Sequence, residues 1–393
     1  MKVLFWVQHL LGIGHARRAS LIAEALVDAG AAVTVLQGGH PVAAAPFRGA
    51  DLVALPPLRA ADAAFSAIVD GDGRPADAAL WAARADTIAR TVDRVRPDAL
   101  ILETFPFGRR AFRAELAGLL DRLIETPDRP LIAASVRDIL VRHNDPRKDA
   151  WIVDRAQRWC DLVLVHGDDR LLPLTASFPR AAALNDRLRY TGYVVPPHTA
   201  ADLRATDGTD EVVVSTGGGA VGANVLGAAV AARTLSTQAG GLTWRLLLGP
   251  DLPADARDRL LAAAGPGVIV EPARRDFPAL LSRCRVSISQ AGYNTVMDVI
   301  AAGCRAVFVP FAQGQESEQT DRATLLATAG RAVVVAEDGL TPVRLAAAVD
   351  RALTAPPAPP IMIARDGAAR TATIVLDAIA ARRGVSEPQR SGV

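Results

Sequence analysis

Short apolar stretches alternate with amphipathic stretches along most of the chain, and this rhythm occurs twice. Continuous runs of Val, Leu and Ile are typical of strands buried on both faces of a parallel sheet, and the helical stretches supply the crossovers that such strands need. The repeated rhythm predicts an α/β protein with two doubly wound parallel sheets that face each other across a cleft. The stretches expected to contain strands are 2–7, 31–37, 97–103, 130–136 and 160–166, then 211–219, 243–249, 267–272, 284–289 and 304–311.

The rhythm stops near residue 190, where RYTGYVVPPHT (189–199) brings Gly, Tyr and two prolines together and a polar stretch follows. Because glycine and proline interrupt regular structure, we expect the connection between the two domains here. The expected organisation is an N-terminal domain of residues 1–192, a linker of residues 193–210, a C-terminal domain of residues 211–360, a helix of residues 361–383 that packs back on the N-terminal domain, and a disordered tail of residues 384–393.

Charge and cysteine content exclude several classes of protein. Lys and Arg number 44 against 42 Asp and Glu, whereas a nucleic-acid-binding protein carries a basic block. The three cysteines lack the paired spacing of a zinc site or a disulfide framework. The first apolar run contains Gln8 and His9 and lacks a signal-peptide exit, and no run approaches the ~20 apolar residues of a membrane span. We expect a cytoplasmic protein without metal or cofactor.

Two glycine-bearing turns follow expected strands, at the sheet edge where open α/β folds bind ligands. They are HLLGIGHARR (9–18) and STGGGAVGAN (215–224). Glycine lets backbone N–H groups approach an anion, and the helix that follows adds the positive end of its dipole. Two such turns suit a diphosphate, although either could be only a tight connection between strand and helix. The glycines assigned to the diphosphate are Gly14, Gly218, Gly219 and Gly222.

A dinucleotide site is disfavoured by the same turns. Gly12 and Gly14 have the first spacing of the dinucleotide pattern, but His15 follows and a third glycine is missing. The strand at 31–37 ends in Gln37 and not in the acidic residue that would bind a ribose. A Walker loop is absent as well, which argues against ATP hydrolysis of that kind.

The stretch SQAGYNTVMDVIAAG (289–303) is the most informative part of the sequence. A helix that starts near Asn294 would aim its free N–H groups at the preceding loop, and Asn294 and Thr295 can donate to phosphate oxygens. Asp298 lies one turn later on the same face, where a carboxylate can accept hydrogen bonds from a ribose diol. The alternative is an acid that only stabilises the helix dipole.

SQAGYNTVMD resembles the donor-binding motif of GT-B glycosyltransferases, whose fold consists of two Rossmann-like domains. Plant-type UDP-glycosyltransferases have His-Cys-Gly-Trp-Asn-Ser-x-x-Glu there, so the resemblance assigns Gln290, Gly292, Asn294 and Thr295 to the diphosphate and Asp298 to the ribose. GGAVGA (218–223) and AAGCRAVFVPF (301–311) are similar to segments of the peptidoglycan lipid-intermediate N-acetylglucosaminyltransferases. The whole chain most resembles an uncharacterised bacterial branch of predicted glycosyltransferases.

The resemblance also implies positions for the rest of the donor. Glu318 and Gln319 match the pair that binds hydroxyls of the donor sugar, although the spacing after Pro310 is longer than in the plant enzymes. Arg275 and Phe277 lie in ARRDFPALL (273–281), which resembles the loop that contacts the nucleobase. UDP is favoured because Asp298 can engage a complete ribose diol.

His15 is the expected catalytic base, since a histidine has its pKa near working pH and the resemblance gives it this role. Glu103 ends the strand at 97–103 and matches the acid that orients the base; the alternatives are a phosphate contact for His15 and a solvated acid for Glu103. Arg137 and Asp138 follow another strand and could line the acceptor pocket. We expect Arg17 and Arg18 on an exposed helix face, and His143 and His166 at surface or packing positions.

These residues predict an inverting, metal-independent glycosyltransferase of the hexosyltransferase class. It would move a sugar from a nucleotide-diphosphate sugar, held by the C-terminal domain, to a hydroxyl of an acceptor, held by the N-terminal domain and of small-molecule type. The alternatives are a UDP-sugar 2-epimerase or hydrolase of the same fold, a membrane-associated transferase to a lipid-linked acceptor, and a non-catalytic nucleotide-sugar binder. Nucleic acid is not an expected partner, peripheral membrane contact stays open, and the oligomeric state is not specified by the sequence.

Overall fold

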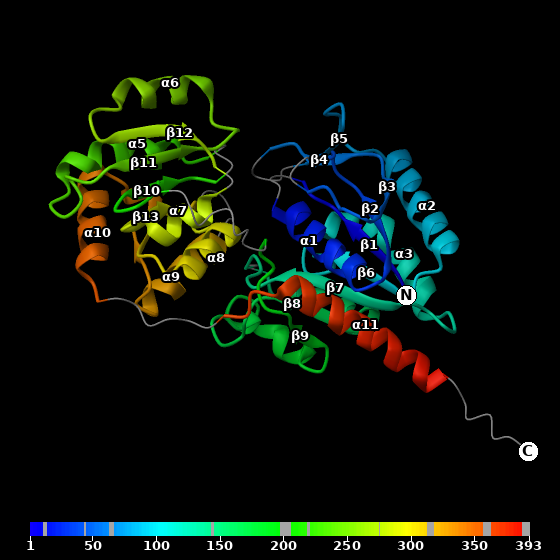
Figure 1. Cartoon of the computed structure of the whole chain (residues 1–393). Coiled ribbons are helices and arrows are strands. Elements are labelled where there is room, and N and C mark those ends of the chain that lie inside the picture. Colours follow the sequence, from blue (N-terminus) through cyan, green and yellow to red (C-terminus); the bar gives the residue numbers. More distant parts are fainter. Residues whose placement is uncertain are drawn as a thin grey trace, which may run out of the picture. The chain divides into compact units, whose positions relative to one another are not determined.

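A computed structural model of the chain describes residues 1–10, 14–42, 45–62, 67–142, 145–196, 206–217, 221–274, 276–312, 318–356 and 363–386 (Figure 1). The chain divides into two compact units. Unit 1 consists of Met1–Pro196 and Ile363–Val393, and unit 2 is Pro197–Met362. Each unit is built on one parallel sheet, with seven strands in unit 1 and six in unit 2 among the described residues. The prediction of two doubly wound parallel sheets is confirmed.

The parallel sheet of unit 1 has the strand order β3-β2-β1-β6-β7-β8-β9, and β4 and β5 form a separate antiparallel pair. Sequence analysis did not identify β3, β4, β5 or β9, which have only three or four residues each. The strands are β1 (Lys2–Val7), β2 (Ala32–Gln37), β3 (Asp51–Ala54), β4 (Leu58–Ala60), β5 (Ile68–Asp70), β6 (Ala99–Glu103), β7 (Leu131–Arg137), β8 (Leu162–His166) and β9 (Leu188–Tyr190), and the helices are α1 (Gly14–Asp28), α2 (Ala78–Val95), α3 (Arg113–Ile124), α4 (Pro146–Trp159) and α11 (Gly367–Ser386).

Both faces of this sheet are covered by helices, as the continuous apolar strands require. In β1, Leu4 and Trp6 pack into the core that contains residues of α2, α3 and α4. Val3, Phe5 and Val7 point to the other face and pack with residues of α1 and α11. Successive side chains of a strand alternate between faces, so a strand with two buried faces must be apolar throughout. Helix α11, red in Figure 1, thus packs on the same unit as the N-terminal strand β1.

Unit 1 extends to Pro196, past residue 193, where the sequence predicted the linker to begin. Tyr193 and Val194 are fully buried, and Tyr193 N–H donates to the carbonyl of Ala364. Val194 also forms an isolated bridge with Asp366. These residues belong to unit 1 because they bind the segment that leads into α11.

The sheet of unit 2 has the order β12-β11-β10-β13-β14-β15. One face packs on residues of α5, α6 and α10, and Val213, Leu247 and Leu280 form a smaller cluster on the other face. Thr341 accepts a hydrogen bond from Arg344 N and starts α10. The strands are β10 (Val212–Ser215), β11 (Trp244–Leu248), β12 (Val268–Pro272), β13 (Val286–Ser289), β14 (Ala306–Phe308) and β15 (Val333–Val334), and the helices are α5 (Ala223–Ala232), α6 (Ala254–Ala263), α7 (Phe277–Arg283), α8 (Tyr293–Ala302), α9 (Glu318–Thr328) and α10 (Pro342–Thr354).

Each sheet has one point where the strand order reverses. In unit 1 the chain builds outward from β1 through β2 to β3 and then returns to place β6 on the other side of β1. In unit 2, β13 lies on the other side of β10 in the same way. The loops that leave two such strands diverge to opposite faces and leave a crevice at the carboxyl ends, where open α/β sheets bind ligands. We therefore expect ligand-binding residues at the carboxyl ends of β1 and β6 in unit 1 and of β10 and β13 in unit 2.

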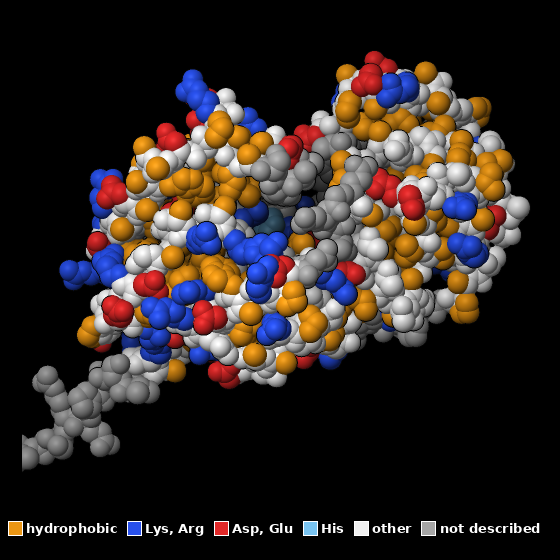
Figure 2. Space-filling view, turned by 180° about the vertical axis from the view of Figure 1, so that it is seen from behind, with side chains coloured by type: hydrophobic (Ala, Val, Ile, Leu, Met, Phe, Trp, Pro, Cys, Tyr) orange, Lys and Arg blue, Asp and Glu red, His pale blue; other side chains and the backbone are white. Residues whose placement is uncertain are grey.

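Among the described helices, none combines the length and the apolar composition needed to cross a lipid bilayer. On the surface drawn in Figure 2, Lys and Arg side chains are interspersed with Asp and Glu, as the near-neutral sequence implies.

Candidate active site

The reversal point of unit 1 brings together His15 and Glu103, which are 88 positions apart in the sequence. His15 lies in the first turn of α1, the helix that follows β1 in the chain, and Glu103 is the last residue of β6. The imidazole Nδ1 is 2.8 Å from Glu103 Oε1. Glu103 is completely buried, and the His15 side chain is 16% exposed. The alternative of a solvated acid at Glu103 is wrong, and the expected pair forms.

Arg18 is a member of this site that sequence analysis placed on an exposed helix face. The structure contradicts that placement, because Arg18 is only 2% exposed and its guanidinium Nη2 donates to Glu103 Oε1. Residues three apart on a helix share one face, so Arg18 follows His15 toward the sheet. Arg18 is buried because it meets the buried carboxylate of Glu103. The sequence could have indicated this, because Arg18 lies three residues after His15 on the same helix.

The surroundings keep Glu103 ionised and His15 neutral. Burial opposes ionisation of Glu103, but the charge of Arg18, followed by the hydrogen bond from His15, outweighs burial and holds the carboxyl pKa below its ordinary value. Burial, followed by the charges of Arg137 and Arg109, lowers the pKa of His15 to about 3, against the opposing effect of Glu103. Since a carboxylate only accepts, His15 Nδ1 carries the proton and Nε2 keeps its lone pair. A neutral imidazole with an unprotonated Nε2 can take a proton from a substrate.

A chain of buried hydrogen bonds continues behind Glu103. Ser135 Oγ donates to Glu103 Oε2 over 3.1 Å and lies 2.8 Å from His166 Nε2, while His166 Nδ1 lies 2.9 Å from Thr191 Oγ1. Burial, followed by the charge of Arg18, lowers the pKa of His166 to about 3. A neutral His166 fits this chain, because it donates from Nε2 to Ser135 and accepts from Thr191 at Nδ1. His166 is thus a packing residue, as expected, and it also orients the hydroxyl that binds the carboxylate. His143 lies outside the described residues.

Two further arginines lie at the same sheet edge. Arg137 ends β7, and its Nη2 would be 3.4 Å from a Cβ atom placed on Gly14, so its guanidinium borders the start of α1. Arg109 follows β6 in the turn that leads to α3 and has a left-handed backbone, with φ 56°. Asp138 is 1% exposed and accepts a hydrogen bond from Ile139 N–H. The sequence assigned Arg137 and Asp138 to an acceptor pocket and did not identify Arg109.

The reversal point of unit 2 presents two helix starts side by side. Helix α5 begins after Gly222 and α8 begins after Gly292, and neither cap residue supplies a side-chain hydrogen bond to the first turn. In α8 the first helical bond joins Val296 N–H to the Gly292 carbonyl, which leaves the preceding N–H groups outside the helical pattern. Because β10 and β13 are neighbours, both positive helix ends meet at one edge of the sheet.

The glycines at these starts serve different needs. A Cβ on Gly222 would come within 2.5 Å of Thr216 Cβ, and its φ of 125° is unfavourable for other residues, so Gly222 is required by the turn itself. A Cβ on Gly292 would meet no described atom within 4 Å, so this glycine borders open space that a ligand can approach. Gly218 and Gly219 lie outside the described residues.

The motif residues of α8 lie in its first two turns. The helix begins at Tyr293, one residue earlier than expected, so Asn294 and Thr295 belong to the first turn and do not cap it. Both are partly exposed, as is Asp298 one turn later, and Gln290 in the preceding loop is 8% exposed. The spacing places Asp298 and Asn294 on one helix face.

Arg322 of α9 is a second residue that sequence analysis missed. It is 2% exposed, and its Nη1 donates to the carbonyl of Ala291 over 3.0 Å. Its Nη2 donates to Glu318 over 2.8 Å, and its guanidinium lies over the Tyr293 ring at 5.7 Å. Arg322 therefore fixes the loop in front of α8. The spacing of four residues from Glu318 was its signal in the sequence.

The remaining donor-site residues occupy different environments. Glu318 is 8% exposed and is held by Arg322, whereas Gln319 is partly exposed and its Oε1 accepts a hydrogen bond from Phe311 N–H over 3.1 Å. Phe277 starts α7 and packs partly buried against the small cluster of unit 2. Arg275 lies outside the described residues.

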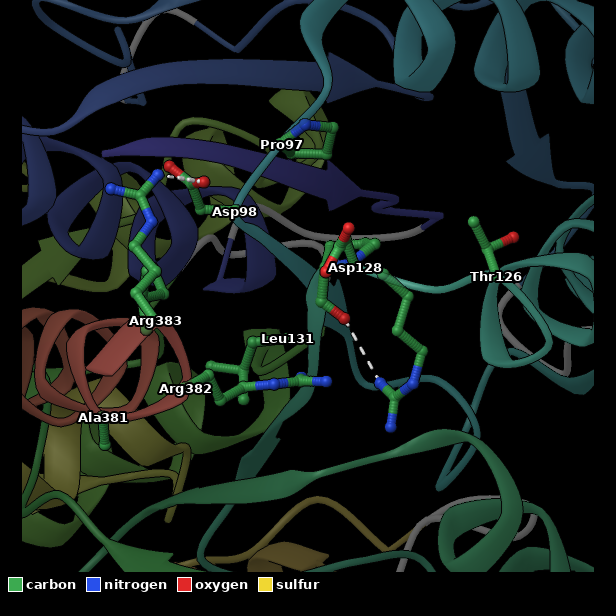
Figure 3. Close-up of a pocket in the computed structure, with 11 residues that line it drawn as sticks. Pro97, Asp98, Thr126, Asp128, Leu131, Ala381, Arg382 and Arg383 are labelled. Carbon is green, nitrogen blue, oxygen red and sulfur yellow. Dashed lines mark hydrogen bonds and ion pairs between the residues drawn. The ribbon is translucent and has the colours of Figure 1, made fainter. Parts of the chain in front are cut away.

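One pocket of about 950 Å³ lies away from these residues, at the opposite edge of the unit 1 sheet (Figure 3). Its walls are the amino ends of β6 and β7 and the end of α11, from which Arg382 and Arg383 point toward the strands. Arg383 pairs with Asp98, and Arg129 pairs with Asp161. This pocket contains none of the residues that the sequence assigned to catalysis or donor binding.

Comparisons with known proteins agree with this architecture. Residues 212–374 match the family described as Glycosyltransferase family 28 C-terminal domain. The chain is 32% identical over 236 residues to a UDP-N-acetylglucosamine--N-acetylmuramyl-(pentapeptide) pyrophosphoryl-undecaprenol N-acetylglucosamine transferase of Rhodospirillum centenum, covering 55% of this chain and 61% of that protein. A protein of the same name from Xanthomonas axonopodis pv. citri is 33% identical over 167 residues, covering 40% and 39%. The chain thus matches less than two thirds of the length of these relatives.

Solved structures resemble nearly the whole chain. The calicheamicin glycosyltransferase CalG4 has a TM-score of 0.62 at 17% identity and covers 98% of this chain and 99% of its own. MurG of Acinetobacter baumannii has a TM-score of 0.60 at 16% identity and covers 96% and 99%. These likenesses show a GT-B fold, and with the family match they confirm the expected resemblance to the GT-B glycosyltransferases.

Proposed function

We propose that this protein is an inverting glycosyltransferase that moves a sugar from a nucleoside-diphosphate sugar to an acceptor hydroxyl. The observation that carries the proposal is the buried pair of neutral His15 and ionised Glu103 at the reversal point of unit 1. Unit 2 supplies a complementary element, because two uncapped helix starts meet at the reversal point of its own sheet. A base and an anion-binding edge are the two elements that such a transfer needs.

In the proposed reaction, Nε2 of His15 takes the proton of the acceptor hydroxyl. The acceptor oxygen forms a bond to the anomeric carbon of the sugar, and the bond between that carbon and the diphosphate oxygen breaks. Its electron pair leaves with the nucleoside diphosphate, and the free N–H groups of α5 and α8 stabilise the charge that develops there. Glu103 stabilises the imidazolium that forms, and Arg18 keeps Glu103 ionised. A single displacement of this kind inverts the anomeric carbon.

We assign the donor to unit 2 and favour UDP as its nucleotide. Gln290, Gly292, Asn294 and Thr295 would bind the diphosphate together with Gly14, Gly218, Gly219 and Gly222. Asp298 would bind both ribose hydroxyls, which a deoxyribose cannot offer. Gln319 and Glu318 would contact the sugar, and Arg275 and Phe277 the base. The matched relatives carry UDP-N-acetylglucosamine in their names, which supports the same donor class.

Two acceptor classes have support. A small molecule is the reading that the sequence favours, whereas the relatives are named for transfer to a pyrophosphoryl-undecaprenol acceptor. The second reading makes the chain a transferase to a lipid-linked acceptor. Either reaction would take place in the cytoplasm, where the three free cysteines would stay reduced.

Binding and transfer with variants of His15 test the proposal. We expect His15→Ala to bind UDP with wild-type affinity in a calorimetric titration and to lose transfer to every acceptor that the wild type uses. The exposed His40 supplies the control, since His40→Ala should leave both quantities unchanged. Transfer that survives in His15→Ala would refute the role of the base, and failure of UDP, dTDP and GDP to bind would refute the donor site.

A 2-epimerase or hydrolase of the same fold is tested without an acceptor. Under the proposal, incubation of the protein with a UDP-sugar alone leaves the sugar nucleotide unchanged over the time in which transfer is complete. A new sugar nucleotide or free sugar in that incubation, at the rate of the reaction with acceptor, would favour the epimerase or hydrolase.

A further inference from the structure

A cluster of ion pairs in unit 2 surrounds the loop that leads from β12 to α7 (Figure 1). Arg274 in this loop donates to both carboxylate oxygens of Asp276, from Nε over 2.8 Å and from Nη2 over 2.6 Å. Its Nη1 donates to Asp207 over 2.7 Å. Two parallel hydrogen bonds between a guanidinium and a carboxylate fix the orientation of both groups. One arginine therefore joins the loop to a residue 67 positions earlier in the chain.

Asp276 gives its carboxylate to Arg274 and not to the helix that it precedes. It is the N-cap residue of α7, but its side chain makes no capping hydrogen bond to the described first turn of that helix. Asp77 and Asp145, which hold the same position before α2 and α4, do accept hydrogen bonds from the first turns of their helices. A capping hydrogen bond stabilises a helix, so the loop forgoes a favourable contact to hold Arg274.

Asp207 is held at both ends of α7. It lies in the stretch that the sequence assigned to the linker, and it belongs to unit 2. Its backbone carbonyl accepts a hydrogen bond over 2.7 Å from Nε of Arg283, the last residue of α7. A Cβ on Gly208 would come within 3.0 Å of the Leu280 carbonyl oxygen, so this segment lies directly on the helix. The position of the Asp207 carboxylate is therefore fixed by α7 itself.

The cluster continues into the sheet through a buried arginine. Arg245 of β11 is 5% exposed, and its Nε and Nη2 donate to the two oxygens of Glu211 over 2.6 and 2.8 Å. Its Nη1 donates to Glu271 of β12 over 2.9 Å. The same oxygen of Glu271 lies 3.4 Å from Arg274 Nη1. The loop is thus connected to two strands of the sheet as well as to Asp207.

The charges of the cluster suit a role in loop conformation. Hydrogen bonds from Arg274 hold the pKa values of Asp207 and Asp276 below their ordinary range, so both carboxyls are ionised at neutral pH. The Arg274 side chain is 24% exposed and that of Asp207 is 46% exposed. Ion pairs between partly exposed groups contribute little to the stability of a fold. What these pairs determine is where the backbone of the loop lies.

We propose that Asp207, Arg274 and Asp276 form a clamp that positions the loop for the nucleobase of the donor and thereby sets the preference for uracil. This inference rests on the proposed function, which assigns the loop to the nucleobase. A site discriminates between two bases when its hydrogen-bonding groups are held in fixed positions. Arg274 is a positioning residue in this inference, because its side chain is engaged by the two carboxylates.

Nucleotide binding to the full chain tests the clamp without an acceptor. The probes are UDP and CDP, which differ only in the base, each titrated calorimetrically. We expect the wild type to prefer UDP. Arg274→Met should weaken UDP binding about 2- to 10-fold, the range for one hydrogen bond, and change CDP binding little, so that the preference is lost. Arg274→Lys keeps the charge without the paired hydrogen bonds and should recover only part of it.

Two further variants and a control complete the experiment. Asp207→Asn/Arg274→Met should bind UDP no more weakly than Arg274→Met alone, because partners in one ion pair are not additive. Asp276→Asn removes the paired charge, keeps the arginine and gives the same test if Arg274→Met does not fold. Arg285 pairs with Asp210 over 3.6 Å, and both side chains are exposed. Arg285→Met is therefore the matched control and should leave both nucleotide affinities unchanged.

The outcomes separate this inference from the proposed function. A wild type that binds neither UDP nor CDP would refute the donor site and the proposed function with it. A wild type that binds both equally, or an unchanged preference in Arg274→Met, would overturn the clamp and leave the transferase function in place. Equal losses for both nucleotides would show that the cluster only supports the fold of unit 2, and additive losses in the double variant would show that Asp207 does not act through Arg274.

Discussion

The buried pair of Arg18 and Glu103 allows a quantitative test of how this site is held together. Arg18 is 2% exposed and Glu103 is fully buried, and the carboxylate also binds His15 and Ser135. Removing one partner of a buried pair leaves the other charge uncompensated, at a cost of about 3–5 kcal/mol. We therefore expect Glu103→Gln to lower the free energy of unfolding by this amount, a large part of the about 5–15 kcal/mol of a typical domain.

The double variant separates the charge effect from other damage. Arg18→Met alone should also cost about 3 kcal/mol, since it leaves the carboxylate without its cation. In Arg18→Met/Glu103→Gln neither charge remains, so we expect the double variant to be at least about 2 kcal/mol more stable than the sum of the single effects predicts. Arg17→Met changes the neighbouring, partly exposed arginine and should stay within about 0.5 kcal/mol of the wild type.

Urea unfolding followed by tryptophan fluorescence measures these free energies of unfolding for unit 1, which contains the pair. The chain has five tryptophans, and all but Trp244 lie in unit 1. The fluorescence transition therefore reports mainly on the unit that contains the pair, and the midpoint and slope give the free energy. A loss below about 1 kcal/mol in Glu103→Gln, or strictly additive single effects, would refute the view that the two charges stabilise each other.

Three further predictions follow from the same structure. Asp298→Ala should weaken UDP binding about 5- to 100-fold and the binding of 2′-deoxy-UDP less, because only the 3′-hydroxyl is then left for the carboxylate; calorimetry that finds equal losses would show that Asp298 does not bind the ribose diol. His15 and His166 are neutral when folded, with pKa values of about 3, and protonate when unfolded; the unfolded chain thus binds more protons below pH 6.5. Stability should fall by about 1.4 kcal/mol per pH unit for each histidine between pH 6 and 5. His166→Gln should remove the contribution of one histidine, which is half of the slope that the two cause together, so an unchanged slope would contradict the assignment. Thr341→Ala should cost about 1 kcal/mol in urea unfolding because it removes the cap of α10, and a neutral result would show that water replaces the cap.

The sequence by itself determined the elements and the sheet edge that carries the site. Continuous apolar runs predicted the central strands, because a strand buried on both faces has no polar position. Turn glycines such as Gly222 marked helix starts, because the conformational effect of a glycine acts within a few residues. Strand ends therefore placed His15, Glu103 and Asn294 at ligand-binding edges before any tertiary information was needed.

The sequence did not predict the shortest strands or the exact boundary between the two units. Strands such as β9 and β15 have three and two residues, too few for a periodic pattern. Tyr193 belongs to unit 1 because it binds Ala364, which is far away in the sequence. A local pattern of glycine and proline could not reveal that contact.

Only the tertiary structure decided which charges meet. The order of strands puts β6 beside β1, and this neighbourhood brings Glu103 to His15 and draws Arg18 out of solvent. Periodicity and capping depend on neighbours along the chain, whereas the burial and the pKa of an ionisable group depend on neighbours in space, and these are fixed by how the strands are ordered in the sheet.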